Sequence, residues 1–525
     1  MHENEDFYHF SRGRFVQNEA YEMASRYARF NVDELARIAA DAVGAKSCVH
    51  VEKFADGMHN KALLLTMDDG KQVVAKIPNP NAGQPHFTTA SEVATMDIMR
   101  NLLETPVPKV YAWCSHAEDT PVGAEYIIME RAAGVSLKSV WHKLELPDRF
   151  AVTKEIAAFQ TAWSSASYEG YGSIYYAFDL PEEHHLPLHR RERGLGADDR
   201  FALGPITGRD WIDDGRQSVT FDRGPWRTIE GYLEAVGRRE MVCVKELPRL
   251  PPTQVTLCGP GTYQPTREKK LRALEYYLQL FKHLAPSDSA VRKPSAWHGD
   301  LHIENIFVDP SEPTKVTCII DWQSTEVAPL FVQARQPYIL DYEGPQTTGV
   351  DRPRLPTNFA NLSSEERKAA NRLLLDQSLC VGYKRWIKSQ TPDIWKCFKF
   401  QETPAFQLLL LARTLLVDGE AIYTARIIEY LQSSNNILEY NGLSIPEHVI
   451  AEVEADSEGA LRGMEAMAGI QETMGNLFPE RGCVRPEHYD EAKDALRQCK
   501  EQIIDMFAST EAERAAWQDS WPFDD

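Results

Sequence analysis

The stretch W-H-G-D-L-H-I-E-N-I-F-V-D, residues 297–309, decides how the rest of the chain is interpreted. It places two histidines, two acidic residues and one asparagine within eight positions and continues directly into an apolar run. Buried polar groups cost free energy unless they are paired. The cluster is therefore either a solvated turn or a functional site, and the neighbouring segments have to decide between the two.

A β-hairpin is predicted directly after this cluster. The runs 306–308 and 315–320 are rich in β-forming residues and flank D-P-S-E-P-T, a turn with two prolines. A symmetric register centred near residue 313 pairs residue 306 with residue 320. The asparagine before the first strand then faces the aspartate after the second, at the open end of the hairpin.

Three oxygen-bearing side chains are expected to meet at that open end. Asn305 begins the first strand, Asp321 ends the second, and Asp300 lies on the loop that enters the hairpin. Hard oxygen donors of this kind suit Mg²⁺. A metal held by a carboxylate and an amide, next to a free carboxylate that can accept a hydroxyl proton, fits phosphoryl transfer.

Upstream, the sequence predicts a small α+β lobe. The runs 61–67 and 71–77 flank Asp-Asp-Gly, which is a strong hairpin signal. Residues 88–103 have apolar residues near helical spacing, and Thr89 and Glu92 have the spacing of a capping box at its start.

Phosphoryl transfer also requires a partner for the nucleotide phosphates, and this lobe offers one. Lys76 lies in the apolar strand K-Q-V-V-A-K-I-P, where an unpaired ammonium is costly, and Glu92 is its candidate partner. The turn F-A-D-G-M-H-N, residues 54–60, could cover phosphates with its backbone N–H groups. It has a single glycine, so Gly57 and Asn60 stay open between tight-turn geometry and phosphate contact.

The combination resembles a known family. Lys76, Glu92, H-G-D-x-x-x-x-N at 298–305 and I-I-D-W at 319–322 occur in the order seen in the aminoglycoside phosphotransferase family. That family has a protein-kinase-like fold, and choline and fructosamine kinases are further relatives. The resemblance covers roughly residues 45–345. Segments such as D-W-Q-S-T-E-V-A-P-L-F resemble the fungal branch, which includes the "altered inheritance of mitochondria" phosphotransferase-like proteins.

The resemblance implies a role for each matching residue. Asp300 matches the catalytic base, and Asn305 and Asp321 match the metal ligands. Lys76 matches the lysine that contacts the α- and β-phosphates, and Glu92 matches its ion-pair partner. The implied cofactors are ATP and Mg²⁺.

Further positions follow from the same resemblance. His298 resembles the histidine that braces the catalytic loop, while His302 is open between bracing and contact with substrate. Residues 129–132 match the hinge whose backbone reads adenine, which makes Met129, Glu130 and Ala132 candidate nucleotide contacts. The second motif reads Asp-Trp-Gln where protein kinases have Asp-Phe-Gly.

The predicted fold is α+β and bilobal, with a small β-rich N-lobe and a large, mainly helical C-lobe. About 165 residues separate the hinge from the catalytic loop, far more than in a protein kinase, and this excess is interpreted as substrate-binding structure. The expected divisions are an N-terminal arm and helix at 1–44, an N-lobe at 45–135, a C-lobe at 136–440 with an insertion at about 143–290, and a helical C-terminal extension at 441–525.

Composition narrows the class of protein. The formal net charge of the 525 residues is −20, which argues against nucleic-acid binding. Nine scattered cysteines, an odd count, favour reduced thiols inside a cell. No run approaches the roughly 18 apolar residues of a membrane span. The acidic N-terminus favours the cytoplasm, and the arginines behind it leave mitochondrial import open.

The sequence thus predicts an ATP- and Mg²⁺-dependent phosphotransferase that acts on a hydroxyl of a small molecule. One alternative is a nucleotide-binding pseudokinase or scaffold without turnover. Another is a Ser/Thr protein kinase, although no Ala-Pro-Glu follows Asp321. The identity of the acceptor and the oligomeric state stay open.

Overall fold

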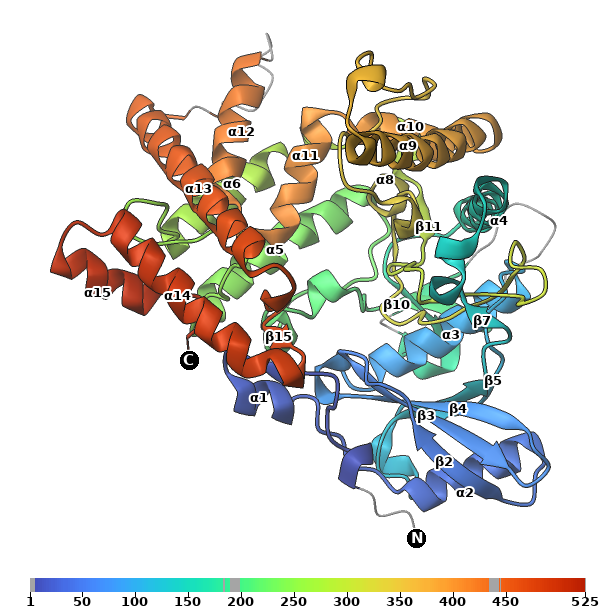
Figure 1. The fold of residues 1–525 in the computed structure, drawn as a ribbon. Coiled ribbons are helices and arrows are strands. Elements are labelled where there is room, and N and C mark those ends of the chain that lie inside the picture. Colours follow the sequence, from blue (N-terminus) through green and yellow to red (C-terminus); the bar gives the residue numbers. More distant parts are fainter. Residues whose placement is uncertain (1–4, 183–184, 189–198, 434–442, 444, 525) are drawn as a thin grey trace.

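Two lobes of different composition meet across the middle of the molecule (Figure 1). The computed structural model describes residues 5–182, 185–188, 199–433, 443 and 445–524. A β-sheet with two helices forms the N-lobe, and helices dominate the C-lobe and the C-terminal extension. The predicted α+β, bilobal fold class is therefore confirmed.

The N-lobe is built on a five-stranded antiparallel sheet with the order β2-β3-β4-β6-β5. Its strands are β2 (Cys48–Lys53), β3 (Asn60–Met67), β4 (Gln72–Pro78), β5 (Val110–Cys114) and β6 (Tyr126–Glu130). The predicted hairpin of 61–67 and 71–77 is confirmed as β3 and β4. Helix α2 (Val32–Val43) packs on the sheet with Leu35 and Ala39 fully buried.

Helix α3 (Phe87–Asn101) lies between the sheet and the C-lobe, in contact with β5, β6 and β8. The predicted capping box at its start is wrong. The N-cap is His86, whose side chain makes no capping hydrogen bond, and Thr89 and Glu92 lie inside the helix. Thr89 donates to the carboxylate of Glu125, and Glu92 pairs with Lys76. Both side chains interact with residues on other elements, so the local capping pattern does not form.

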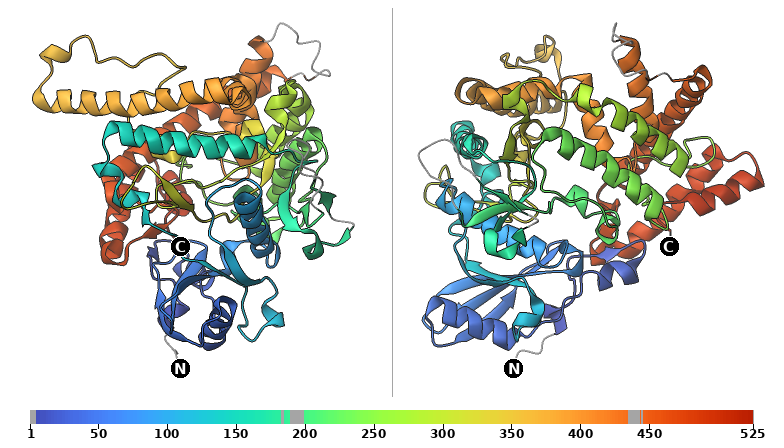
Figure 2. Two further views of the ribbon diagram at one scale, coloured as in Figure 1. Left: turned by 90° about the vertical axis from the view of Figure 1, so that its right-hand side faces the viewer. Right: turned by 180° about the vertical axis from the view of Figure 1, so that it is seen from behind.

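The C-lobe has one continuous apolar core, which runs from α4 to α12 and includes the predicted insertion. Helix α4 packs against both α9 and the catalytic hairpin, and α5 packs against α6. The long helix α9 lies at the end remote from the N-lobe (Figure 2). The main helices are α4 (Leu146–Ser165), α5 (Ile229–Glu246), α6 (Arg267–Leu284), α7 (Ser289–Arg292), α8 (Leu330–Gln333), α9 (Ser364–Gln390), α10 (Pro392–Gln401), α11 (Pro404–Leu411) and α12 (Glu420–Ser433).

Two small sheets lie between these helices. One has the order β8-β10-β9, formed by β8 (Ser173–Tyr176), β9 (Leu186–Pro187) and β10 (Phe201–Gly204). The other pairs β11 (Pro294–Ala296) with β14 (Val327–Pro329). Because β11 leads into the catalytic loop and β14 follows Asp321, this pairing holds both ends of the predicted site together.

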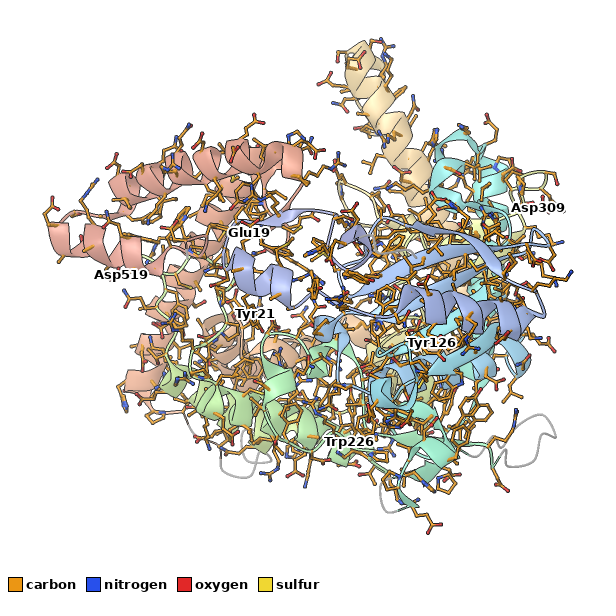
Figure 3. The ribbon with its side chains drawn as sticks, turned by 90° about the horizontal axis from the view of Figure 1, so that it is seen from below. Glu19, Tyr21, Tyr126, Trp226, Asp309 and Asp519 are labelled. Carbon is orange, nitrogen blue, oxygen red and sulfur yellow. The ribbon has the colours of Figure 1, made fainter. Side chains whose placement is uncertain are left out.

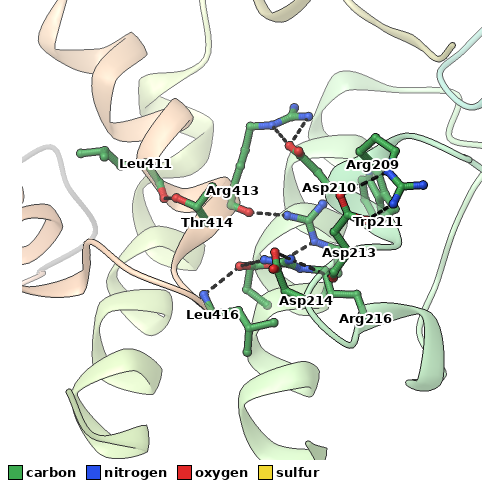
Figure 4. Close-up of polar contacts among 12 residues, drawn as sticks. Arg209, Asp210, Trp211, Asp213, Asp214, Arg216, Leu411, Arg413, Thr414 and Leu416 are labelled. Atoms are coloured by element: carbon green, nitrogen blue, oxygen red, sulfur yellow. Dashed lines mark hydrogen bonds and ion pairs between the residues drawn. The ribbon is translucent and has the colours of Figure 1, made fainter. Parts of the chain in front are cut away.

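A buried network of charges joins the insertion to the helices of the C-lobe (Figure 4). The Glu240 carboxylate on α5 accepts from Arg216 at 2.8 and 2.9 Å and from Arg239 at 2.9 Å. Arg239 also donates to the carbonyl of Arg413, and Arg413 pairs with Asp210 at 2.8 Å. Burial opposes its ionisation, but Arg239 and Arg216 hold the pKa of Glu240 below its usual value.

The predicted catalytic hairpin forms, with β12 (Ile306–Val308) and β13 (Val316–Ile319) in one sheet with β7 (Val135–Ser136). Its register differs from the symmetric one by one residue, since Ile306 pairs with Ile319 rather than with residue 320. The turn is shorter than assumed, and a bulge after Phe307 inserts an extra residue into β13. Asn305 and Asp321 nevertheless stay at the same open end.

The two ends of the chain meet beside the N-lobe. Strand β1 (Arg14–Phe15) pairs with β15 (Cys483–Val484), and α1 (Glu19–Ala24), labelled at Glu19 and Tyr21, lies between the extension and the sheet (Figure 3). The extension consists mainly of α13 (Glu447–Met474), α14 (Tyr489–Phe507) and α15 (Glu511–Ser520). The predicted boundary between 440 and 441 lies outside the described residues. No helix in the described ranges is long and apolar enough to span a membrane.

Candidate active site

An ion-paired lysine connects the two lobes. The Lys76 ammonium on β4 donates to both oxygens of the Glu92 carboxylate, at 2.7 and 3.0 Å, and to Asp321 Oδ1 at 2.7 Å. The Lys76–Glu92 pair that the sequence predicts is therefore present. Asp321 comes from the end of the catalytic hairpin, so a single ammonium joins β4, α3 and the C-lobe.

The three groups differ in their exposure, and the pKa values of the two carboxylates are shifted in opposite directions. Burial raises the pKa of Glu92, although Lys76 opposes this shift. Desolvation also acts against ionisation of Asp321, but the Lys76 ammonium overrides it and holds the pKa of Asp321 below its usual value. The Lys76 and Glu92 side chains are 9% and 3% exposed, whereas that of Asp321 is 40% exposed. Asp321 is thus the member of the group that a ligand can reach.

The backbone of Asp321 is unusual. Its φ is 66°, in the left-handed region that non-glycine residues rarely adopt. Such conformations cost free energy and persist where the surrounding structure enforces them, often at functional sites. This backbone conformation directs the carboxylate from the end of β13 toward the N-lobe, where it accepts a hydrogen bond from Lys76.

The catalytic loop places Asp300 at the surface of the C-lobe. The backbone N–H of Asp300 donates to Nδ1 of the fully buried His298 at 3.2 Å, so His298 donates through Nε2 to the Ile320 carbonyl at 2.9 Å. Burial lowers the pKa of His298, which favours this neutral form. His298 therefore joins the loop to the end of β13, which agrees with the predicted bracing position.

The exposed Asp300 carboxylate has a single side-chain neighbour in its loop. Nε2 of His302 lies 2.9 Å from Asp300 Oδ1, and the His302 ring stacks on Tyr338 with the centroids 4.1 Å apart. The His302 ring thus contacts the loop carboxylate directly, and Tyr338 fixes its plane. Tyr338 belongs to a short helical turn that no motif in the sequence indicated.

Asn305 and Asp321 supply the donors expected of a magnesium site. Asn305 Nδ2 donates to the Asp300 carbonyl at 2.9 Å, and this bond leaves its carbonyl oxygen as a possible ligand. Mg²⁺ is commonly held by one or two protein oxygens together with water and substrate phosphates. An amide oxygen and a partly exposed carboxylate fit that requirement. Within the described part of the chain, no group of three or more His, Cys, Asp or Glu side chains forms a denser metal site.

The turn over the cleft, residues 54–60, is held by polar contacts. Asn60 and Gln323 exchange amide hydrogen bonds of 2.7 and 3.2 Å, which link this turn to the Asp-Trp-Gln segment. Gly57 has no left-handed φ, and a Cβ there would make only ordinary contacts. Tight-turn geometry therefore does not require a glycine at position 57. Gln323 was not predicted as a contact, although the departure from Asp-Phe-Gly marks its position.

The hinge leads directly from the N-lobe sheet to the catalytic hairpin. Met129 and Glu130 end β6, and four residues later β7 pairs with β12. At Gly134, with φ of 92°, a Cβ would lie 2.2 Å from the Val308 carbonyl, so only glycine fits. No hydrogen bond of the Ala132 backbone is seen to any residue described here. The predicted adenine-reading positions thus lie on the segment that joins the two lobes, and their role stays a prediction.

Comparison with known proteins identifies the family. The model of the phosphotransferase enzyme family, APH, matches residues 50–332, more than half of the chain. The chain belongs to this family. The match spans every residue discussed above from the turn at 54–60 to the Asp-Trp-Gln segment.

Relatives of this phosphotransferase-family chain come from fungi. A subtelomeric hrmA-associated cluster protein of Aspergillus fumigatus is 28% identical over 513 residues, covering 91% of this chain and 97% of the relative. Altered inheritance of mitochondria protein 9, mitochondrial, of Yarrowia lipolytica is 24% identical over 419 residues, covering 75% of this chain and 70% of the relative.

Solved structures with a related fold include two aminoglycoside phosphotransferases. The streptomycin-ATP-APH(2")-IIa ternary complex aligns with a TM-score of 0.35 and 11% identity, over 77% of this chain and 97% of that chain. Aminoglycoside phosphotransferase APH(4)-Ia aligns with a TM-score of 0.33 and 13% identity, over 82% of this chain and 99% of that chain.

Proposed function

We propose that this member of the family is an ATP- and Mg²⁺-dependent phosphotransferase that moves the γ-phosphoryl group to a hydroxyl of a small molecule. The observation that carries the proposal is the Lys76–Asp321 contact of 2.7 Å across the cleft, beside the exposed Asp300 carboxylate. The proposal is supported by His298, which contacts the Asp300 backbone on one side and the residue before Asp321 on the other, so the exposed Asp300 carboxylate and the Lys76–Asp321 pair come from adjoining segments.

Each residue then has a defined task. Lys76 binds nucleotide phosphates, and Glu92 holds its ammonium in place. Asn305 and Asp321 hold Mg²⁺, which neutralises phosphate charge when it is bound. Asp300 orients the acceptor hydroxyl and takes its proton as the oxygen–phosphorus bond forms and the bond to the leaving ADP breaks. His302 positions the Asp300 carboxylate.

The nucleotide base is assigned to the other side of the cleft. The backbone from Met129 to Ala132 reads adenine, and the turn with Gly57 and Asn60 covers the phosphates. The Asn60–Gln323 amide pair closes this turn onto the C-lobe. Closure of the two lobes excludes water from the transfer, which favours the acceptor hydroxyl over hydrolysis.

The first experiment measures the transfer of label from γ-labelled Mg-ATP into a fungal metabolite extract and, separately, into a peptide pool. Asp300→Asn is the inactive variant, and Glu312→Gln, an exposed acid at the other end of the same hairpin, is the matched control. We expect a labelled small molecule with wild type and Glu312→Gln but not with Asp300→Asn.

Three outcomes would change the proposal. Label in peptides alone would indicate a protein kinase. Thermal stabilisation by Mg-ATP without any labelled product would favour a nucleotide-binding scaffold without turnover. Full activity of Asp300→Asn would show that another group is the base.

A further inference from the structure

The loop between β4 and α3, residues 79–86, joins the two halves of the ion pair at the cleft. Lys76 lies near the end of β4, and Glu92 lies inside α3. Ala82 and Gly83, in the middle of the loop, are buried. Buried backbone carbonyls require hydrogen-bond partners. Whatever holds this loop therefore also affects how Lys76 and Glu92 meet.

The bridging segment, residues 209–217 of the insertion, supplies those partners from the C-lobe. Arg209 Nη1 donates to the Ala82 carbonyl at 2.7 Å, and Gln217 Nε2 donates to the Gly83 carbonyl at 2.8 Å. The two donors come from the two ends of the bridging segment, and the two acceptors are neighbours in the loop. The insertion therefore holds the N-lobe at the connection between Lys76 and Glu92.

The inner residues of the bridging segment are anchored in the C-lobe (Figure 4). Asp210 pairs with Arg413 at 2.8 Å, and Arg216 pairs with Glu240 at 2.8 Å. Trp211, which lies between them in the sequence, is fully buried. The residues next to both N-lobe contacts are thus fixed to the C-lobe helices. The bridging segment is therefore a firm connection between the C-lobe core and the loop at 79–86.

The insertion holds α3 itself at two more points. Nε2 of His86, the N-cap of α3, lies 3.1 Å from the Asp179 carbonyl, and the Tyr176 hydroxyl donates to Asp97 at 2.7 Å. His86 has a φ of 67° and a ψ of −58°, a rare and strained turn conformation. Such strain persists where the surrounding contacts enforce it. The start of α3 is thus set by tertiary contacts with the insertion.

We propose that Arg209 and Gln217 are positioning residues for nucleotide binding, which keep Glu92 on Lys76 by holding the loop between them. This inference rests on the proposed function, in which Lys76 binds the nucleotide phosphates. Neither side chain has to touch the nucleotide, because both act through the backbone of the loop. The insertion, which the sequence indicates as substrate-binding structure, thereby also acts on the nucleotide side of the cleft.

The geometry at Lys76 explains why a small movement of α3 matters. The ammonium donates to Glu92 at 2.7 and 3.0 Å and to Asp321 at 2.7 Å. If Glu92 moves away, Asp321 is the carboxylate that remains on Lys76. The ammonium is then drawn toward the proposed metal ligand and is no longer held for the phosphates. Hydrogen bonds weaken steeply when their distance and angle are lost.

The test is calorimetric titration of the full-length protein with Mg-ATP, with a thermal scan of each variant. We expect Arg209→Ala to weaken Mg-ATP binding about fivefold, and Arg209→Ala combined with Gln217→Ala to weaken it about tenfold. Arg209→Lys keeps a donor for the Ala82 carbonyl and should recover most of the loss. Arg227→Ala, the matched control, removes an exposed arginine of the same insertion and should match wild type.

Glu92→Gln distinguishes positioning from a general effect on the fold. In this background the double variant should weaken Mg-ATP binding no further, because residues that act through one group are not additive. The same loss in both backgrounds would overturn the inference. Unchanged Mg-ATP affinity of the double variant, with or without a lower thermal midpoint, would also overturn it and leave the proposed function intact. Failure of wild type to bind Mg-ATP would overturn both proposals.

Discussion

Two charge networks, one around Glu240 in the C-lobe and one around Lys76 between the lobes, differ in one respect. Around Glu240, the carboxylate and both guanidiniums that contact it are at most 2% exposed. Around Lys76, two groups are buried in the same way, but the third, Asp321, is 40% exposed. Charge, burial and short distances are common to both networks. The Glu240 network also has partly exposed carboxylates at its edge, Asp214 on Arg216 and Asp210 on Arg413, whereas the partly exposed Asp321 is joined through one ammonium to the N-lobe.

The difference teaches how a structural network is distinguished from a binding site. Both oxygens of the Glu240 carboxylate are engaged, by two buried guanidiniums and by the Leu416 N–H, so this carboxylate has no oxygen left for a substrate. In the Lys76 network, Asp321 uses one carboxylate oxygen to accept from Lys76 and is partly exposed to solvent. Its backbone is in the left-handed region, and its second oxygen is available to a ligand. Substitutions in the two networks should therefore affect different measurements.

The largest effect on stability is expected at Glu240. Glu240→Gln leaves the buried Arg239 guanidinium without its ion-pair partner and leaves Arg216 with Asp214 alone, which costs about 3 to 5 kcal/mol of unfolding free energy. Denaturant unfolding measures this loss, and Glu234→Gln, on an exposed face of the same helix, should stay within about 0.5 kcal/mol of wild type. A cost below about 1 kcal/mol would show that the network is not structural.

Lys76→Met should reduce both stability and nucleotide binding. Its removal leaves Glu92 buried without a partner, at a cost of about 2 to 3 kcal/mol, because a protonated Glu92 limits the penalty. The pKa of Glu92 is raised in the fold, so lowering the pH favours the folded variant, and its deficit relative to wild type should shrink between pH 7 and pH 5. Unfolding at both pH values measures this difference. A deficit that grows on acidification would contradict the assigned protonation.

Asp321→Asn should separate binding from stability. The carboxylate is partly exposed and Lys76 keeps Glu92, so the unfolding free energy should change by about 1 kcal/mol or less. Mg-ATP affinity should fall at least about tenfold, because a metal ligand with negative charge is lost. Calorimetric titration beside a thermal scan gives both values. A large loss of stability with unchanged Mg-ATP affinity would place Asp321 in the same class as Glu240.

The smallest effect is expected at His59, whose imidazole is neutral in the fold. Its pKa is lowered to about 3, whereas an unfolded histidine has a pKa of about 6.5. Stability is therefore lost as the pH falls below about 6.5, since the unfolded chain then gains a proton that the folded chain refuses. His59→Gln removes this contribution.

The measurement compares the unfolding free energy at pH 7 and pH 5. Wild type should lose about 1 kcal/mol more than His59→Gln, a value reduced because the ring is only partly buried. His298 adds acid sensitivity to both proteins and cancels in the difference. Equal losses in the two proteins would show that His59 is not held neutral.

Much of the candidate site could be predicted from the order of motifs along the chain. The Lys76–Glu92 pair, the hairpin after the catalytic loop and the position of His298 were all expected and are present. The capping box at Thr89 was wrong because Glu125 and Lys76 compete for its side chains. The hairpin register was wrong by one residue because the turn is two residues shorter than the symmetric pairing assumed, and the bulge in β13 restores only one of the two.

Contacts between distant segments could not be predicted in the same way. Gln323 reaches Asn60 across 263 positions, and Tyr338 supports His302 by stacking. The β1–β15 pairing joins two residues of the N-terminal arm to two residues of the C-terminal extension. Runs of two residues are too short to give a strand signal in the sequence.

The sequence by itself determined which chemistry the cleft can carry, since residue type and local spacing set the donors, the base and the cation. Only the tertiary structure decided which charges are shielded, which backbone is strained and which part of the C-terminal extension pairs with the N-terminal arm. These properties depend on burial and on packing between segments hundreds of residues apart. Local patterns reflect the backbone preferences of a few neighbouring residues, and such preferences carry no information about a partner elsewhere in the chain.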